Sequence, residues 1–196
     1  MKTSIKNIAA AFMMLAASSL SANNGNSEKS VKVSTENSRA VVLQLNNLSA
    51  GTSISIVGQN GEILFQDEAE EARYAKVFNL QQMQKGEVYL EIENDEQLEI
   101  LTIQVTDTKA YLEKAAEATI EKPILKMNGD QAKVFFGNNE GKVKVTIMDA
   151  NGEIAYRQSA EGGSASTYDL SDLPAGSYTF QFKTGDRTFY EGITIK

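Results

Sequence analysis

Histidine, cysteine and tryptophan are all missing from this chain of 196 residues. Without histidine the chain lacks the usual general base at neutral pH, the commonest metal ligand and any Ser-His-Asp or Cys-His catalytic arrangement. Without cysteine it has neither a disulfide framework nor a thiolate metal site. The sequence therefore predicts no catalytic, metal-binding or cofactor-binding residue, and we expect a protein that is not an enzyme.

Other signatures of catalysis and binding are also missing. No serine lies in a Gly-x-Ser-x-Gly elbow, no glycine-rich phosphate loop occurs, and no motif places two carboxylates for glycoside hydrolysis. The stretch from Asp149 to Glu153 lacks the alternating ligands of an EF-hand and is better explained as a hairpin turn. The acidic run from Asp67 to Glu71 is best explained as a solvated loop, because its counterpart from Ala160 to Ser164 is not acidic.

The one long apolar run lies at the N-terminus, from Ile8 to Leu20, and follows two lysines. At about 13 residues it is shorter than the roughly 20 needed to span a bilayer. Small residues end it at Ala22, so residues 1–22 are predicted to be a cleaved signal peptide. The alternatives are a hydrophobic helix of a folded domain and a membrane anchor. Polar residues 23–30 predict a flexible leader.

Acidic residues outnumber basic ones, 26 to 19, which gives a formal net charge of −7. Nucleic acids and anionic lipids need compensating lysine and arginine, so neither is expected as a partner. We expect the mature protein to have no membrane span and to reach the periplasm, the cell surface or the extracellular space.

The second half of the chain repeats features of the first. Asn60-Gly61-Glu62-Ile63 recurs as Asn151-Gly152-Glu153-Ile154, a shift of 91 residues. Phe78-Asn79-Leu80 is matched by Tyr168-Asp169-Leu170 at a shift of 90, as a one-residue loop deletion would produce. The agreement extends to the spacing of the apolar residues around these motifs, which indicates a diverged tandem repeat.

Each copy reads as a series of short strands. Lys142 to Ile147 alternates strictly between polar and apolar residues. The Asn151-Gly152 pair that follows predicts a hairpin with a type I′ turn, in which both residues have positive φ. In the next strand, Ile154 and Tyr156 are expected to point inward. Further strands are predicted at 41–45, 53–56, 62–66, 75–78, 87–93, 98–105, 178–182 and 188–195, and a turn at 184–187.

This pattern predicts an all-β fold with two tandem immunoglobulin-like antiparallel β-sandwich domains after the signal peptide. The domains are expected at 31–105 and 122–196, and a small barrel is the alternative fold. Residues 106–121 are predicted to be a linker. Its alanine-rich composition favours a helix by propensity, while an extended segment that leads into the second domain is the alternative.

The second copy is rich in aromatic residues. Their period-two placement predicts a buried face for most of them, and a sugar-stacking platform is the alternative. The residues are Tyr156, Tyr168, Tyr178, Phe180, Phe182, Phe189 and Tyr190.

Residues 141–196 carry a hairpin, the stretch Leu170-x-x-Leu173-Pro174-x-Gly176-x-Tyr178 and a terminal strand that ends in Lys196. With these features the chain resembles the C-terminal sorting domains of type IX (Por) secretion substrates of Bacteroidetes. The resemblance implies an immunoglobulin-like sandwich that an outer-membrane secretion machine recognises and removes after export.

Two functions are compatible with these features. The first is a secreted, non-enzymatic β-sandwich module that binds protein or glycan at the cell envelope. The alternative is a type IX secretion substrate whose C-terminal domain is a sorting signal and contacts the secretion machinery.

Overall fold

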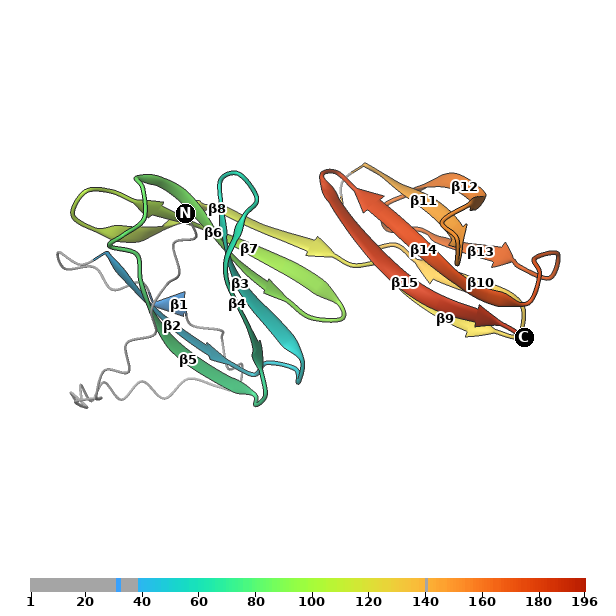
Figure 1. Ribbon diagram of the computed structural model, residues 1–196, viewed down its shortest axis with the longest axis horizontal. Helices are drawn as coiled ribbons and strands as arrows, with labels where there is room; N and C mark the ends of the chain where they lie inside the picture. The colour runs from blue at the N-terminus through green and yellow to red at the C-terminus, as the bar shows by residue number, and fades with distance from the viewer. Residues whose placement is uncertain (1–30, 33–38, 140) are drawn as a thin grey trace. The chain divides into compact units, whose positions relative to one another are not determined.

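The computed structural model describes residues 31–32, 39–139 and 141–196, and all regular secondary structure in these residues is β-strand (Figure 1). The predicted all-β fold class is therefore confirmed. The expected signal peptide over 1–22 and the leader over 23–30 lie outside the described residues. Within the described residues, no helix is long and apolar enough to cross a membrane.

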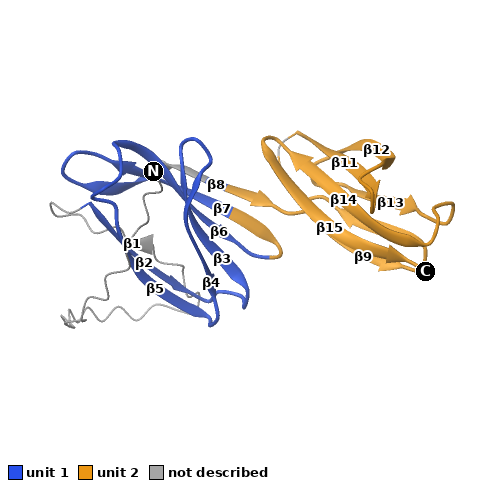
Figure 2. Cartoon of the chain, in the orientation of Figure 1, with its two compact units in different colours: residues 1–94, 99–118 blue, residues 95–98, 119–196 orange. Residues whose placement is uncertain are grey.

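The chain divides into two compact units (Figure 2). Unit 1 comprises Met1–Asn94 and Glu99–Ala118, and unit 2 comprises Asp95–Leu98 and Thr119–Lys196.

Unit 1 contains two antiparallel sheets with the strand orders β1-β2-β5 and β4-β3-β6-β7-β8. The strands are β1 (Val31–Lys32), β2 (Ala40–Asn46), β3 (Thr52–Gly58), β4 (Ile63–Ala69), β5 (Arg73–Asn79), β6 (Gly86–Glu93), β7 (Gln97–Val105) and β8 (Ala110–Glu121), the last of which continues into unit 2. Buried side chains of both sheets form one hydrophobic core, which includes Leu43, Leu45, Ile54, Ile56, Phe78, Leu90 and Ile103. This arrangement is a β-sandwich.

Unit 2 contains two sheets with the strand orders β9-β10-β13 and β12-β11-β14-β15. The strands are β9 (Ile124–Asn128), β10 (Gln131–Phe135), β11 (Lys142–Asp149), β12 (Ile154–Glu161), β13 (Ala165–Asp169), β14 (Gly176–Thr184) and β15 (Arg187–Ile195). Its buried core includes Val134, Phe136, Val145, Ile147, Tyr168, Leu170, Phe180, Phe182 and Ile193.

The two units share strand order and strand register. The order β4-β3-β6-β7 of unit 1 corresponds to β12-β11-β14-β15 of unit 2. Ile54 lies opposite Ile92 in unit 1, and Val145 lies opposite Phe182 in unit 2, as the shifts of 91 and 90 predict. The sequence match therefore corresponds to equivalent positions in two sandwiches.

The Asn-Gly hairpins are present, but the predicted turn type is wrong. The loops cover Gln59 to Glu62 and Ala150 to Glu153, so each is longer than a two-residue turn. Only the glycines have positive φ, 77° at Gly61 and 80° at Gly152, and the asparagine before each does not. A bulge in the flanking strand accompanies each loop. A longer loop that ends in a left-handed glycine next to a bulge explains this geometry.

The helix expected within residues 106–121 is also wrong, because β8 occupies Ala110–Glu121. β8 pairs with β7 at the edge of the five-stranded sheet. Ala110 is fully buried, and Leu112 packs against the core of unit 1. Backbone pairing with β7 and this burial override the helical propensity of the alanines, which is a weak preference.

The inward orientation expected for Ile154 and Tyr156 is wrong as well. Their side chains are 52% and 45% exposed. Both lie on β12, an edge strand of a four-stranded sheet that packs against a sheet of only three strands. The outermost strand therefore extends past the core, although the Tyr156 ring still packs edge-on against Tyr168, 5.8 Å between centroids.

The opposite edge of this sheet differs between the units. In unit 1, the outer edge of β7 is paired with β8. In unit 2, the equivalent strand β15 pairs with β14 over its full length, and no strand pairs with its outer edge among the described residues. β15 therefore presents unpaired backbone groups along that edge.

Candidate functional site

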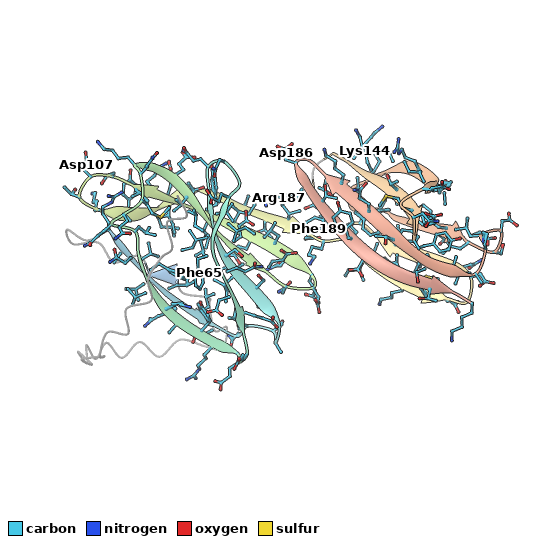
Figure 3. The ribbon with its side chains drawn as sticks, viewed as in Figure 1. Phe65, Asp107, Lys144, Asp186, Arg187 and Phe189 are labelled. Carbon is cyan, nitrogen blue, oxygen red and sulfur yellow. The ribbon has the colours of Figure 1, made fainter. Side chains whose placement is uncertain are left out.

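A groove of about 500 Å³ lies in unit 2, and we call it the hairpin groove. It is formed by the end of β8, the segment after β10 and the β14–β15 hairpin, in which Asp186 lies in the turn and Arg187 begins β15 (Figure 3). Its lining residues are Thr119, Ile120, Glu121, Asn138, Asn139, Thr184, Gly185, Asp186 and Arg187.

One side of the hairpin groove is held by hydrogen bonds between two segments. The Asn139 side chain accepts a hydrogen bond from the Glu121 backbone N–H at 2.9 Å and donates one to the Glu121 carbonyl oxygen at 2.6 Å. The Asn138 backbone N–H donates to the Glu121 carboxylate at 2.8 Å. The Asn139 side chain thus pairs with the backbone of Glu121 as a neighbouring strand would. These bonds fix this side of the groove.

Two glycines allow this close approach. A Cβ atom at Gly137 would lie 2.7 Å from the Glu121 carbonyl oxygen, and one at Gly162 would overlap the Asn139 carbonyl oxygen. Both oxygens belong to the backbone, and the Glu121 Cβ, which is also close to Gly137, does not move with the rotamer, so a change of rotamer cannot relieve either clash. Glycine is therefore required at both positions.

Most residues that line the hairpin groove are polar, although polar and apolar atoms contribute about equally to its surface. Thr184 is 7% exposed, and its hydroxyl has no hydrogen-bond partner within the described part of the chain. The β14–β15 hairpin adds the Asp186 carboxylate and the Arg187 guanidinium, and Glu121 adds a second carboxylate. The groove thus combines hydrogen-bond donors and acceptors without a catalytic arrangement.

The amino-acid sequence does not predict this groove. Its residues come from three separate segments, none of which carries a local motif. The sequence predicts residues 184–187 only as a turn, and a turn is present between β14 and β15. The three segments come together only in the folded structure. The one signal in the sequence is the acidic and basic pair Asp186-Arg187 in the predicted turn.

The acidic stretch from Asp149 to Glu153 forms the β11–β12 turn. The Asp149 carboxylate accepts hydrogen bonds from the backbone N–H groups of Asn151 at 2.9 Å and Glu153 at 2.8 Å. Its oxygen therefore stabilises the turn. Across the described residues, no three acidic or histidine side chains converge in a group that could hold a metal ion.

Asp67, in the other acidic run, lies at the centre of a polar cluster on β4 and β5. Its carboxylate accepts hydrogen bonds from Lys76 Nζ at 2.8 Å and from the Tyr74 hydroxyl at 3.1 Å. The hydrogen bond from Lys76 holds the pKa of Asp67 below its usual value. Burial, followed by the bond to Asp67, raises the pKa of Tyr74 well above its usual range.

Replacing Asp67 with asparagine is expected to lower the free energy of unfolding of unit 1 by about 0.2–1 kcal/mol at pH 7, because the ion pair is partly exposed. The carboxylate has a lower pKa in the folded than in the unfolded protein. Its contribution is therefore present above about pH 4 and is lost as the pH falls through the lowered folded value. Urea unfolding of both proteins at pH 7 and pH 2.5 measures this difference, and an equal loss at both pH values would contradict it.

The aromatic residues divide into a buried set and two exposed tyrosines. Tyr168, Tyr178, Phe180, Phe182 and Phe189 are buried, as the alternation predicts for most of the aromatics. Tyr156 and Tyr190 are 45% and 59% exposed, but they lie on β12 and β15, at opposite edges of the sheet. The two exposed rings therefore do not form a continuous stacking platform.

The stretch from Leu170 to Tyr178 has a structural role. Leu170 is buried, and its carbonyl oxygen accepts a hydrogen bond from the Leu173 N–H at 3.0 Å. The Tyr178 hydroxyl donates to the Pro174 carbonyl oxygen at 2.9 Å, which ties the start of β14 to the turn before it. The motif therefore specifies a turn between two strands.

Comparison with known proteins gives one family match. Residues 127–196 match the family described as secretion system C-terminal sorting domain. No curated protein matches the chain. A solved structure titled "Biofilm associated protein - BSP domain" is 14% identical, with a TM-score of 0.30 over 81% of this chain. This chain spans only 27% of the length of that one.

The family match begins in β9 and extends to the last residue, so it covers almost the whole sandwich of unit 2. It also includes all of residues 141–196, on which the resemblance in the sequence rests. That resemblance is confirmed: unit 2 is similar to the secretion system C-terminal sorting domain.

Proposed function

We propose that the chain is a type IX secretion substrate in which unit 2 is the sorting signal and unit 1 is a non-enzymatic module. The observation that carries this proposal is the family match over residues 127–196. The sequence alone favours a stand-alone envelope module, because the repeated motifs occur in both copies and a sorting signal is needed only once. The family match lies in the second copy, at the C-terminal end, and it favours a secretion substrate over a stand-alone module.

The open edge of β15 supports this role for unit 2. A sorting signal must offer a surface that its receptor can bind, and an unpaired strand edge can accept a strand from a partner. β15 offers such an edge among the described residues, whereas β7 of unit 1 is paired with β8. The two sandwiches are therefore not equivalent as binding surfaces, despite their shared strand order.

Unit 1 is the cargo in this proposal. Its expected partners are proteins or glycans at the cell surface, where export through a sorting signal would deliver it. The acidic chain carries a formal charge of −7, which disfavours nucleic acid as a partner.

Secretion of the full chain in a bacterium with a type IX system tests the proposal. The native protein is expected at the cell surface or in the medium, with unit 2 removed. A chain that stops after Glu121 should stay in the periplasm, as should the native chain in a strain without the secretion machine. The control for misfolding of the truncated chain is a reporter protein fused to the N-terminal side of residues 119–196. Secretion of this fusion would show that unit 2 alone directs export. Mass spectrometry of each fraction gives the result, and an intact native chain found only in the periplasm would contradict the proposal.

A further inference from the structure

We propose that the outer edge of β15 pairs with an extended segment of a partner protein, and that this segment places a lysine or arginine opposite Glu191. The inference deepens the proposed function and rests on it for the source of the segment, which is the secretion machinery. It specifies the mode of binding, the addition of one strand to the sheet, and the chemistry of the strand that is added.

Unit 1 shows how a sheet of this kind is completed. Its larger sheet has the order β4-β3-β6-β7-β8, and β8 covers the edge of β7 with Ala110 and Leu112 on the core. The matching sheet of unit 2 has the order β12-β11-β14-β15, and no fifth strand pairs with β15 in the part of the chain that the structure describes. The shared strand order therefore defines the place of a further strand in unit 2, and an extended segment is the occupant that fits it.

The backbone of β15 offers hydrogen-bonding groups at alternate residues. Thr184 and Arg187 are paired across a two-residue turn. They begin the hydrogen-bonded pairs with β14, which recur at every second residue. The residues between them direct their N–H and C=O groups to the outer edge, and an added strand would pair with these groups. They are Thr188, Tyr190, Gly192 and Thr194.

Glu191 determines which strand the edge accepts. It lies directly opposite Phe180, and its neighbours on the same face, Phe189 and Ile193, are buried. The middle of the edge therefore carries a carboxylate on the core-facing side, although the side chain itself is exposed. Inward-pointing charges on edge strands oppose pairing with strands that bring no compensating group. A basic residue directly opposite Glu191 would compensate its charge, whereas an acidic residue would be repelled.

The same residue disfavours a second copy of this chain as the occupant. β15 has nine residues, from Arg187 to Ile195, and Glu191 is at its centre. Antiparallel pairing of two β15 strands over their full length would place two Glu191 side chains opposite each other, which is destabilising. The edge thus combines attraction for a basic strand with repulsion of its own copy, as specific interfaces do.

Binding of two synthetic peptides to the full chain, followed by amide NMR, tests the proposal. Both peptides have the nine-residue length of β15 and blocked ends, and valine and threonine alternate along them. The central valine is replaced by lysine in one peptide and by glutamate in the other. The lysine peptide is expected to bind at least about threefold more tightly. It should protect the outward amides of β15 from hydrogen exchange.

Two variants assign the binding to this edge. Glu191→Lys should reverse the order of the two peptides, and because it changes an exposed side chain and no backbone group, it should remain folded. Tyr190→Pro removes one outward N–H, a change that edge strands tolerate, and should weaken both peptides at least about tenfold. Its matched control is Tyr190→Ala, which keeps the N–H and should weaken binding less.

Equal affinity for the two peptides, an unchanged order in Glu191→Lys, or protection confined to residues outside β15 would overturn the inference. A dimer of the full chain that Tyr190→Pro disrupts in sedimentation would also overturn it, because a second copy would then occupy the edge.

The secretion assay separates this inference from the sorting role. Glu191→Lys is expected to reduce surface delivery of the full chain. Normal delivery of the native chain, of Glu191→Lys and of Tyr190→Pro would overturn the strand pairing and leave the sorting role intact. A native chain retained in the periplasm would instead contradict the sorting role, and the peptide titrations would still decide whether β15 accepts a strand.

Discussion

Phe180→Ala is expected to lower the free energy of unfolding of unit 2 by about 3–5 kcal/mol, the range for a fully buried phenylalanine. The Phe180 side chain is 0% exposed. Its ring centroid lies 5.7 Å from that of Tyr168 on the other sheet and 5.9 Å from that of Phe182. Truncation would therefore remove contacts between the two sheets and leave a cavity between them.

Calorimetry or urea unfolding of the full chain, monitored by tyrosine fluorescence, measures this loss. The matched variant is Leu90→Ala, at the equivalent position of unit 1, where the side chain is 1% exposed. It should lower the stability of unit 1 by about 2–5 kcal/mol. A loss below about 1 kcal/mol in either unit would show that its core is not packed as described.

Gly162→Ala is expected to destabilise unit 2 by at least about 2–3 kcal/mol, toward the upper end of the usual range for overpacking. The added Cβ would overlap the Asn139 carbonyl oxygen. The backbone fixes the position of both atoms, so no side-chain rotation can separate them. Relief requires the 137–139 segment to move, which would also disturb the hydrogen bonds between Asn139 and Glu121.

The control for this variant is Gly192→Ala in β15. A Cβ atom there meets nothing within 4 Å, and the backbone does not have a positive φ. Its stability is expected to be unchanged or raised by up to about 1 kcal/mol, because alanine reduces the entropy of the unfolded chain. Thermal melts of the two variants give the comparison, and equal melting temperatures would mean that Asn139 does not pack against Gly162.

The strands could be predicted from sequence because alternation is a local property. The run from Lys142 to Ile147 is a strand, and the Asn-Gly pairs do mark hairpins. The same local rules could not give the turn type. In unit 2 the geometry depends on Asp149, whose carboxylate binds two backbone N–H groups and stabilises a longer loop.

The remaining errors arise from effects outside the local sequence. Alternation predicts which residues of β12 share a face, but it does not show that β12 is an edge strand. Ile154 lies on the expected inner face and is still exposed, because the core does not extend to that edge. Alanine propensity over β8 is overridden by pairing with β7. The hairpin groove joins segments more than 40 residues apart, such as Asn139 and Asp186, so no local pattern could predict it.

The register shared by the two units has a consequence for folding. Strands that pair in the same register can exchange partners between units, and such misassembly is a known failure of tandem homologous domains. Side-chain volume opposes this exchange here. β3 places Ile54 and Ile56 opposite Ile92 and Leu90, while β14 carries Phe182 and Phe180 at the equivalent positions. A swapped pairing would force two phenylalanines into core positions that unit 1 fills with isoleucine and leucine, and it would leave the core of unit 2 underfilled. The difference in size between the two sets of core residues thus disfavours the swapped form and directs each strand to its own sandwich.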